Sequence, residues 1–306
     1  MEYYFDVGLS EAGKRIDLYL SKKIGRSREY CKRLIGNKNV SLSYGKNSLK
    51  PSYVVKFGDS IYIKIPDEKP LEIKSQRLDI DIIFENDRYF VINKPAGLVV
   101  HPGAGNFDNT LANALVYKLG HNFPAEDIRP GIIHRLDKDT SGIMIIAKNL
   151  DAKYKLSLLF KNRNIKKIYH ALCFGVPKGD FFIINAPIAR HPKLRKIMSV
   201  AAGGKEAITE VRIKERFKSV FLAEIELKTG RTHQIRVHMK YLDYPVVGDR
   251  VYQIKGSVKY PIMRQALHAY SLEFVDPFTG EYKRFIAKYQ QDFVNLLNYL
   301  ATVIGK

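Results

Sequence analysis

The 306-residue sequence predicts an α+β fold arranged in two domains. Its expected strands come in runs interrupted by single helices, without the regular strand–helix alternation of a doubly wound sheet. The chain is longer than most single domains, and its 45% of hydrophobic residues suffice for packed cores. A polar segment at residues 67–80 is typical of a linker, so we expect a small domain before it and a large one after it.

The small domain, residues 13–66, is expected to hold two helices and a few short strands, with residues 1–12 before it as an N-terminal strand or tail. The first helix spans residues 15–24 and ends at Gly25, and Ser27 caps the second. The expected strands are residues 3–9, 40–42, 53–57 and 60–65.

The large domain, residues 81–306, mixes strands and helices throughout its length. Its expected strands are residues 81–85, 87–93, 165–176, 206–217, 219–228, 267–274 and 282–287. Its expected helices are residues 109–119, 149–162 with Asn149 as the cap, 230–242 after an opening turn, and a final amphipathic helix around 293–300. The last two strands form a hairpin across a turn that contains Pro277 and Gly280.

The chain carries 51 Lys and Arg against 31 Asp and Glu, a formal charge of +20. This excess favours a polyanionic partner, and nucleic acid before a membrane surface because the charge is spread along the chain. The alternative is a basic protein whose charges are only solvated. Cys31 and Cys173 are the only cysteines, which excludes a disulfide framework or a multi-cysteine zinc site. No apolar run is long enough for a membrane span and no secretory signal is recognisable, so we expect a cytoplasmic protein.

Residues 131–142 read Gly-Ile-Ile-His-Arg-Leu-Asp-Lys-Asp-Thr-Ser-Gly and form a densely polar loop with apolar flanks. We expect strands at Ile132–Ile133 and at residues 143–147 to hold this loop rigidly. Asp137 lies among basic and hydroxyl side chains that favour its ionised form, whereas Asp139 is expected to shape the loop. A charged surface turn is the alternative.

A second polar concentration, residues 230–239, reads Gly-Arg-Thr-His-Gln-Ile-Arg-Val-His-Met and follows a strand. In the helix expected here, His233, Arg236 and Lys240 share one face. The sequence has no P-loop, no nucleophile elbow and no His-Glu-x-x-His zinc motif. What remains is carboxylate chemistry on a nucleic acid, in which an ionised Asp acts as a nucleophile or stabilises an oxocarbenium-like sugar.

Six motifs, spread over the large domain, occur together in this chain. They are His134-Arg-Leu-Asp with Thr140-Ser-Gly, Gly230-Arg-Thr-His-Gln-Ile-Arg-Val-His, Asn93-Lys-Pro-Ala-Gly-Leu-Val-Val-His-Pro-Gly, Lys167-Ile-Tyr-His-Ala, Ala186-Pro-Ile-Ala-Arg-His and Gln265-Ala-Leu-His-Ala. Together they resemble the RluA-type pseudouridine synthases. Residues 13–66, with two small helices and a basic outer face, resemble the S4 RNA-binding module.

The resemblance implies a fold and a reaction. Residues 81–306 should form a catalytic domain with a mixed, mainly antiparallel sheet, preceded by an S4-like domain that binds RNA. The family isomerises uridine to pseudouridine in RNA without a cofactor, and no metal is expected. The substrate implied is large-subunit ribosomal RNA, or a ribosome precursor particle that contains it, at the helix 69 stem-loop of 23S RNA. We expect a monomer without an obligate protein partner or a membrane.

The resemblance also implies roles for individual residues. Asp137 becomes the catalytic aspartate, Arg236 its basic partner, and Tyr169 the ring that lies against the uracil. Arg135 matches the residue that enters the RNA stack where the target base leaves, and Leu267 matches the apolar wall of the pocket. Other residues expected to bind RNA are His134, Arg231, His233, Arg26, Arg28, Lys32 and Arg33.

Three alternatives stay open at this point. The chain could modify another site in ribosomal or transfer RNA. It could be a non-catalytic RNA-binding assembly factor, which would keep the basic surface but not need Asp137. It could also be a glycosylase, which would break the same glycosidic bond but release free uracil.

Overall fold

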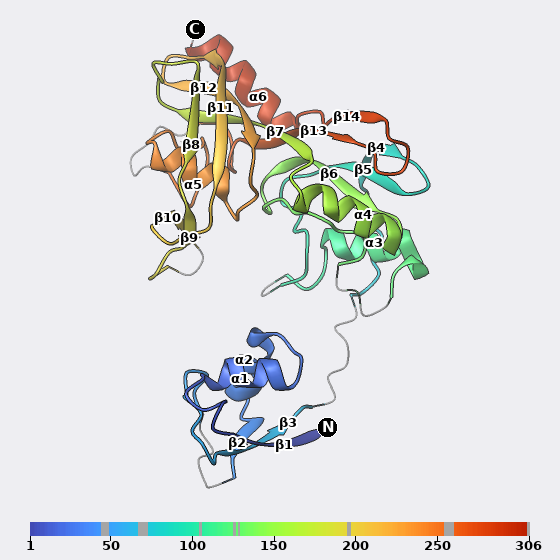
Figure 1. The fold of residues 1–306 in the computed structure, drawn as a ribbon. Helices are drawn as coiled ribbons and strands as arrows, with labels where there is room; N and C mark the ends of the chain where they lie inside the picture. Colours follow the sequence, from blue (N-terminus) through green and yellow to red (C-terminus); the bar gives the residue numbers. More distant parts are fainter. Residues whose placement is uncertain are drawn as a thin grey trace. The chain divides into compact units, whose positions relative to one another are not determined.

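The computed structural model of the protein (Figure 1) describes residues 1–43, 49–66, 73–103, 106–124, 127, 129–194, 197–253 and 260–304. The chain separates into two compact units, Met1–Pro70 and Leu71–Lys306. The division lies inside residues 67–80, the segment in which we expect a linker.

The N-terminal unit packs two short helices against a small antiparallel sheet. Its elements are β1 (Glu2–Asp6), α1 (Ile16–Lys23), α2 (Arg28–Gly36), β2 (Val40–Leu42) and β3 (Ser60–Lys64). Among the described residues the strand order is β1-β3-β2, and Ile16, Leu20 and Leu34 from the helices are buried in the core with Ile61 and Ile63 of β3. The cap predicted for α2 is confirmed, because Ser27 accepts a hydrogen bond from the backbone N–H of Tyr30 at 3.2 Å.

The strand expected at residues 53–57 is wrong. This segment pairs with the chain just before α1 instead of joining the sheet: the Ile16 N–H donates to the Tyr53 carbonyl at 2.7 Å, and the Val55 N–H donates to the Lys14 carbonyl at 2.9 Å. Only one isolated bridge, Arg15 to Val54, results. An apolar alternating run predicts burial of one face, but not whether a strand or a loop lies beside it.

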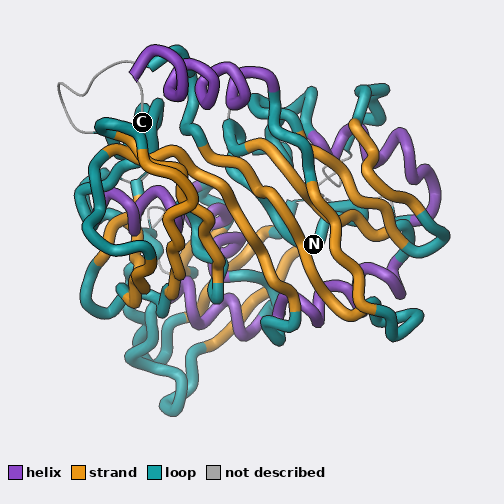
Figure 2. The backbone as a smooth tube through the Cα atoms, turned by 90° about the horizontal axis from the view of Figure 1, so that it is seen from above, coloured by secondary structure: helices purple, strands orange, loops and turns teal. Residues whose placement is uncertain are grey.

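The larger unit is built on one twisted sheet, which Figure 2 shows as strands running side by side. Within the described residues the order of this nine-stranded sheet is β4-β5-β6-β13-β7-β12-β11-β8, and β14 pairs with β13. Its strands are β4 (Asp81–Glu85), β5 (Tyr89–Lys94), β6 (Ser141–Ala147), β7 (Ile165–Phe174), β8 (Phe181–Asn185), β11 (Ile208–Arg216), β12 (Val220–Leu227), β13 (Leu267–Val275) and β14 (Tyr282–Ile286). All neighbours are antiparallel except β13 and β6, so the mixed, mainly antiparallel sheet is confirmed.

Helices pack on the sheet in two groups. They are α3 (Leu111–Leu119), α4 (Leu150–Lys161), α5 (Gln234–Tyr241) and α6 (Gln291–Tyr299), with a 3-10 turn at Gly120–Asn122 and a π turn at Leu300–Ile304. The first two share a core with β5 and β6, and the last two share a core with β7, β11 and β12. Tyr169 on β7 packs against both cores, so it lies at the junction between them. Asn149 caps α4 as predicted, with the Ala152 N–H donating to its side chain at 2.9 Å.

The parallel pairing of β6 with β13 depends on Gly142. Its φ is +115°, a conformation that favours glycine, and a Cβ at this position would lie 2.2 Å from the Ala269 carbonyl oxygen. The backbones can therefore approach closely enough for Ser141 and Gly142 to pair with His268 and Ala269. This contact places the loop before β6 next to β13 and β7.

Two further expectations need correction. Ile132 and Ile133 form no strand, because only one bridge joins Ile132 to Ile146. The edge strand β8 and the hairpin of β9 (Ile188–Arg190) and β10 (Met198–Val200) were not expected. The strands β9 and β10 have three residues each and few buried side chains, so they carry little pattern. In contrast, β8 contains the apolar run of residues 181–184, for which no strand was predicted. The irregular segment 253–261 falls largely outside the described residues.

Candidate active site

Asp137 lies in the turn that leads into β6. The Thr140 N–H donates to the Asp137 carbonyl at 3.1 Å, and the neighbouring Leu136 is buried in the core. The Asp137 side chain is 21% exposed, so its carboxylate reaches the surface from a turn that is anchored on both sides. A carboxylate held in this way has few orientations available, as a reacting group requires.

Lys94, at the end of β5, binds this turn from the side of the core that β5 and β6 share with α3 and α4. Its ammonium is completely buried and donates to the carbonyls of Pro95 at 2.7 Å, Leu98 at 2.9 Å and Lys138 at 3.0 Å. Burial lowers the pKa of Lys94 to about 7, against the opposing effect of the nearby Asp139 charge. Lys94 was assigned no role from the sequence, because its burial and its three carbonyl partners are not visible there.

The β13 side holds the same turn through polar side chains. Arg264 donates to the Asp139 carbonyl at 3.2 Å, and Gln265 donates to the Thr140 hydroxyl at 3.2 Å. In both contacts the two residues are 125 positions apart in the chain. The turn is therefore held by Lys94 at the end of β5 and by the two residues Arg264 and Gln265 shortly before β13. Of these last two, only Gln265 belongs to a motif that the sequence singled out.

Arg236 of α5 lies between two carboxylates. Its Nη1 is 2.9 Å from Asp137 Oδ2, while its Nε and Nη2 bind Asp249 at 2.6 and 2.9 Å. Asp249 is completely buried and also accepts the backbone N–H groups of Val251 and Tyr252 at 2.9 and 3.1 Å. Burial lowers the pKa of Arg236, but the hydrogen bonds and charge of Asp249 outweigh it and raise the pKa overall. Asp137 thus has a permanent cation beside it.

His233 also approaches Asp137, but not from the helix face on which it was expected. It precedes α5 as the N-cap residue, with φ at +56°, so the predicted face shared with Lys240 is wrong for His233. Its Nε2 is 3.8 Å from Asp137 Oδ2 and its Nδ1 lies 2.8 Å from the Tyr252 hydroxyl. Burial lowers the pKa of His233, which favours the neutral ring at physiological pH. The Tyr252 ring lies 5.1 Å from the Arg236 guanidinium.

A cavity of about 480 Å³ opens beside Asp137. The described residues that line it are Ile133, His134, Arg135, Asp137, Phe160, Lys161, Arg163, Lys167, Tyr169, Leu227, Lys228, Thr229, Gly230, Arg231 and Thr232. Six of these are Lys or Arg, and Asp137 is the single acidic residue among them. A cavity of this composition favours a polyanion while presenting it with one carboxylate.

A smaller recess of about 70 Å³ joins Asp137 to Tyr169, Arg236 and Leu267. Leu267 is 4% exposed and contributes an apolar side chain to the recess. Burial, with a contribution from the Asp137 charge, raises the pKa of the Tyr169 phenol, so this hydroxyl is protonated at neutral pH. The structure thus brings together all four residues that the sequence assigned to catalysis and to the pocket wall.

Arg135 and His134 differ in their surroundings although they are neighbours. Arg135 is exposed, lines both the cavity and the recess, and has no hydrogen bond or ion pair with any described residue. His134 Nε2 accepts the Ile145 N–H at 3.0 Å, and its ring stacks on Phe160 at 4.5 Å. Burial lowers the pKa of His134 to about 3, so the ring is neutral and holds β6 rather than offering a charge to RNA.

The basic residues of the N-terminal unit have partners of their own. Arg28 Nε lies 2.9 Å from Asp17 Oδ2, and Asp17 is completely buried, so Arg28 has a structural role that was not expected. Lys32 lies 3.5 Å from Glu29. The guanidinium groups of Arg26 and Arg33 lie 5.8 and 5.3 Å from the Tyr30 ring. These groups keep their exposed positions on and beside α2.

Among the described residues, no group of three or more His, Cys, Asp or Glu could hold a metal ion. In the same part of the chain, no helix is long and apolar enough to cross a membrane.

Comparison with known proteins gives a consistent result. Residues 88–241 match the family model described as RNA pseudouridylate synthase. The chain is 41% identical to ribosomal large subunit pseudouridine synthase D of Buchnera aphidicola, in an alignment that covers 94% of this chain and 95% of that protein. It is 40% identical to an uncharacterized RNA pseudouridine synthase of Synechocystis, covering 94% and 89%. The structure of human RNA pseudouridylate synthase domain containing 4 shares the fold, with a TM-score of 0.58 and 24% identity over 72% of this chain and 92% of that one.

Proposed function

The chain belongs to the RNA pseudouridylate synthase family, and from this premise we propose that it isomerises uridines of large-subunit ribosomal RNA, with Asp137 as the catalytic carboxylate. The observation that carries the assignment is the position of Asp137: 2.9 Å from Arg236, in a recess shared with Tyr169, beside a cavity lined with cations. The relatives named as large-subunit enzymes support the choice of RNA.

Asp137 takes part directly in the exchange of the N1–C1′ bond for a C5–C1′ bond. In one route its carboxylate attacks the ribose or the base; in the other it removes a ribose proton to give a glycal. Either route requires the ionised form in the free enzyme, which Arg236 favours from 2.9 Å. When the Asp137 charge is consumed, Arg236 remains neutralised by the bidentate pair with Asp249, so no buried charge is left alone.

The remaining residues handle the base. Uracil in a stem-loop is stacked and must be extruded, at a cost of about a few kcal/mol, before Asp137 can reach its sugar. Arg135 is free to enter the space that the base leaves, because no described residue binds it. In the recess we assign the Tyr169 ring to stacking on the base and Leu267 to the apolar wall, and we assign the Tyr169 hydroxyl to assisting removal of the C5 proton.

The S4-like N-terminal unit binds the same RNA through its basic residues. Arg26, Lys32 and Arg33 contact phosphates from α2 and the turn before it, whereas Arg28 contributes less because it holds Asp17. The target is the helix 69 stem-loop of 23S RNA, and the protein acts as a monomer.

Release of tritium from RNA labelled at uracil C5 tests this function. We expect release from 23S RNA and from a helix 69 stem-loop, without free uracil. Free uracil on chromatography would indicate a glycosylase. If the protein binds RNA but releases no tritium from 23S RNA, the stem-loop or transfer RNA, it is a non-catalytic assembly factor. Tritium release from transfer RNA alone would mean that the substrate is transfer RNA and not ribosomal RNA.

A further inference from the structure

Glu206, a residue with no role so far, joins two of the cations that line the large cavity. Its carboxylate lies 3.0 Å from Arg163 Nη2, and its backbone carbonyl accepts a hydrogen bond from Arg231 Nε at 2.8 Å. Arg163 follows α4 and Arg231 follows β12, so two separate segments meet at this residue. Both arginines line the cavity.

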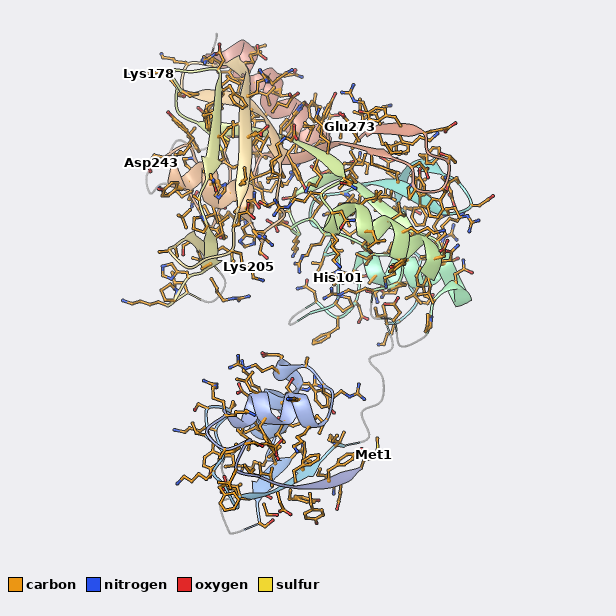
Figure 3. The ribbon with its side chains drawn as sticks, viewed as in Figure 1. Met1, His101, Lys178, Lys205, Asp243 and Glu273 are labelled. Atoms are coloured by element: carbon orange, nitrogen blue, oxygen red, sulfur yellow. The ribbon has the colours of Figure 1, made fainter. Side chains whose placement is uncertain are left out.

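The position of Glu206 is determined by its backbone. Its neighbour Lys205, labelled in Figure 3, exchanges two backbone hydrogen bonds of 2.9 Å with Ile188 of β9. The side chains of Arg163 and Glu206 are 50% and 54% exposed, and ion pairs at such positions contribute little to stability. Fold stability therefore does not explain why an acidic side chain is held against this cationic cavity.

Arg163 belongs to a crowded group of positive charges. Lys161 and Lys167 line the same cavity, and the pKa of Lys167 is lowered by burial and by the Arg163 charge. Lys228 also lines it but is already paired with Glu210 and Glu226. An anion placed among these groups relieves their repulsion. In the free protein the Glu206 carboxylate is the anion that Arg163 binds.

We propose that Arg163 and Arg231 form a subsite for a backbone phosphate of the RNA, and that the Glu206 carboxylate occupies the Arg163 part of it until RNA enters, while Arg231 stays bound to the Glu206 backbone carbonyl. The inference rests on the RNA substrate proposed above. A phosphate offers arginine the same two-oxygen geometry as a carboxylate and competes directly for the guanidinium. Because the cavity also contains Asp137, this phosphate lies close to the extruded nucleotide. Glu206 then sets the affinity for RNA by competing with the phosphate.

The test measures the Kd of the full chain for a helix 69 stem-loop RNA at several KCl concentrations. Glu206→Gln should bind about two- to fivefold more tightly, since the exposed ion pair that RNA replaces is weak. Arg163→Gln should bind more weakly and reduce the slope of log Kd against log[KCl] by about 0.7 to 0.9, the loss of one phosphate contact. In the Arg163→Gln background, Glu206→Gln should have no further effect.

Asp151→Asn is the matched control, because it removes one negative charge from an equally exposed pair, Asp151 with Lys155 at 3.1 Å. Equal Kd changes in Glu206→Gln and Asp151→Asn would overturn the proposal, as would a Glu206→Gln effect that persists without Arg163. Binding is measured independently of turnover. Coupling between Glu206 and Arg163 without tritium release would therefore preserve the subsite and refute the proposed reaction.

Discussion

Asp249 provides a sharp test of how Arg236 is held against Asp137. The substitution Asp249→Asn keeps the size of the side chain but removes the charge that binds Arg236 at 2.6 and 2.9 Å. The amide oxygen can still accept one of these hydrogen bonds or the N–H groups of Val251 and Tyr252, but the amide nitrogen would face a guanidinium donor. Arg236, 5% exposed, would then have Asp137 as its one carboxylate partner among the described residues.

The magnitude follows from this burial. Removing one partner of a buried ion pair costs about 3–5 kcal/mol, and the surviving hydrogen bond places the expected loss near the lower end, about 3 kcal/mol. Without the bidentate contact, Arg236 is expected to draw Asp137 out of position, and a displacement of about 1 Å can lower the rate about 100-fold. RNA affinity should be unchanged, because Asp249 is completely buried and its side chain is therefore out of reach of RNA.

Urea unfolding gives the change in stability, and tritium release at saturating RNA gives the change in kcat. Asp180→Asn is the control: Asp180 pairs with Arg216 at 2.6 Å but is 80% exposed, so its loss should cost less than about 1 kcal/mol. A loss in Asp249→Asn no larger than in this control, together with full turnover, would refute the role given to Asp249.

Three other substitutions separate binding, chemistry and stability. Tyr169→Phe keeps the stacking surface but lacks the hydroxyl, so kcat should fall about 100-fold or more at unchanged Kd; full turnover would exclude the hydroxyl from proton transfer. Arg135→Ala should lower the extent of base extrusion, read by 2-aminopurine fluorescence beside the target, more than it weakens binding. In the wild type, the folded-state pKa of about 3 for His134 lies below its unfolded value, so stability should decline by about 1.4 kcal/mol per pH unit as pH falls from about 6.5 towards 3. His134→Gln should show a shallower decline in urea unfolding, and an identical pH dependence would contradict the assignment.

Much of the fold follows from local patterns in the sequence. Caps such as Ser27 and Asn149 and the apolar spacing of the helices depend on a few neighbouring residues, so they could be predicted. Residues 53–57 and 132–133 were predicted as strands because they are apolar, yet each makes only one bridge. Whether such a run becomes a strand depends on which segment lies beside it, and this is decided by tertiary contacts.

The residues of the site also fall into those that the sequence singled out and those whose roles depend on tertiary contacts. The sequence singled out Asp137 by its charged neighbours and Arg236 by its motif, and the family resemblance paired them. Asp249 and Lys94 received no role, because their functions arise from contacts with Arg236 and with the Lys138 carbonyl. A buried carboxylate or ammonium is unremarkable in a sequence, and its importance appears only when the burial and the partners are known.

The most direct test of the central claim maps pseudouridines in unmodified 23S RNA after incubation with the purified protein or with Asp137→Ala. We expect new pseudouridines in the helix 69 loop with the wild type and none with Asp137→Ala, although the variant binds the RNA with a similar Kd. Asp137→Asn preserves the size of the side chain and should be equally inactive. Because this variant leaves no cavity, its inactivity would show that the loss in Asp137→Ala does not come from misfolding. Pseudouridine formation by either variant at the wild-type rate would contradict the account.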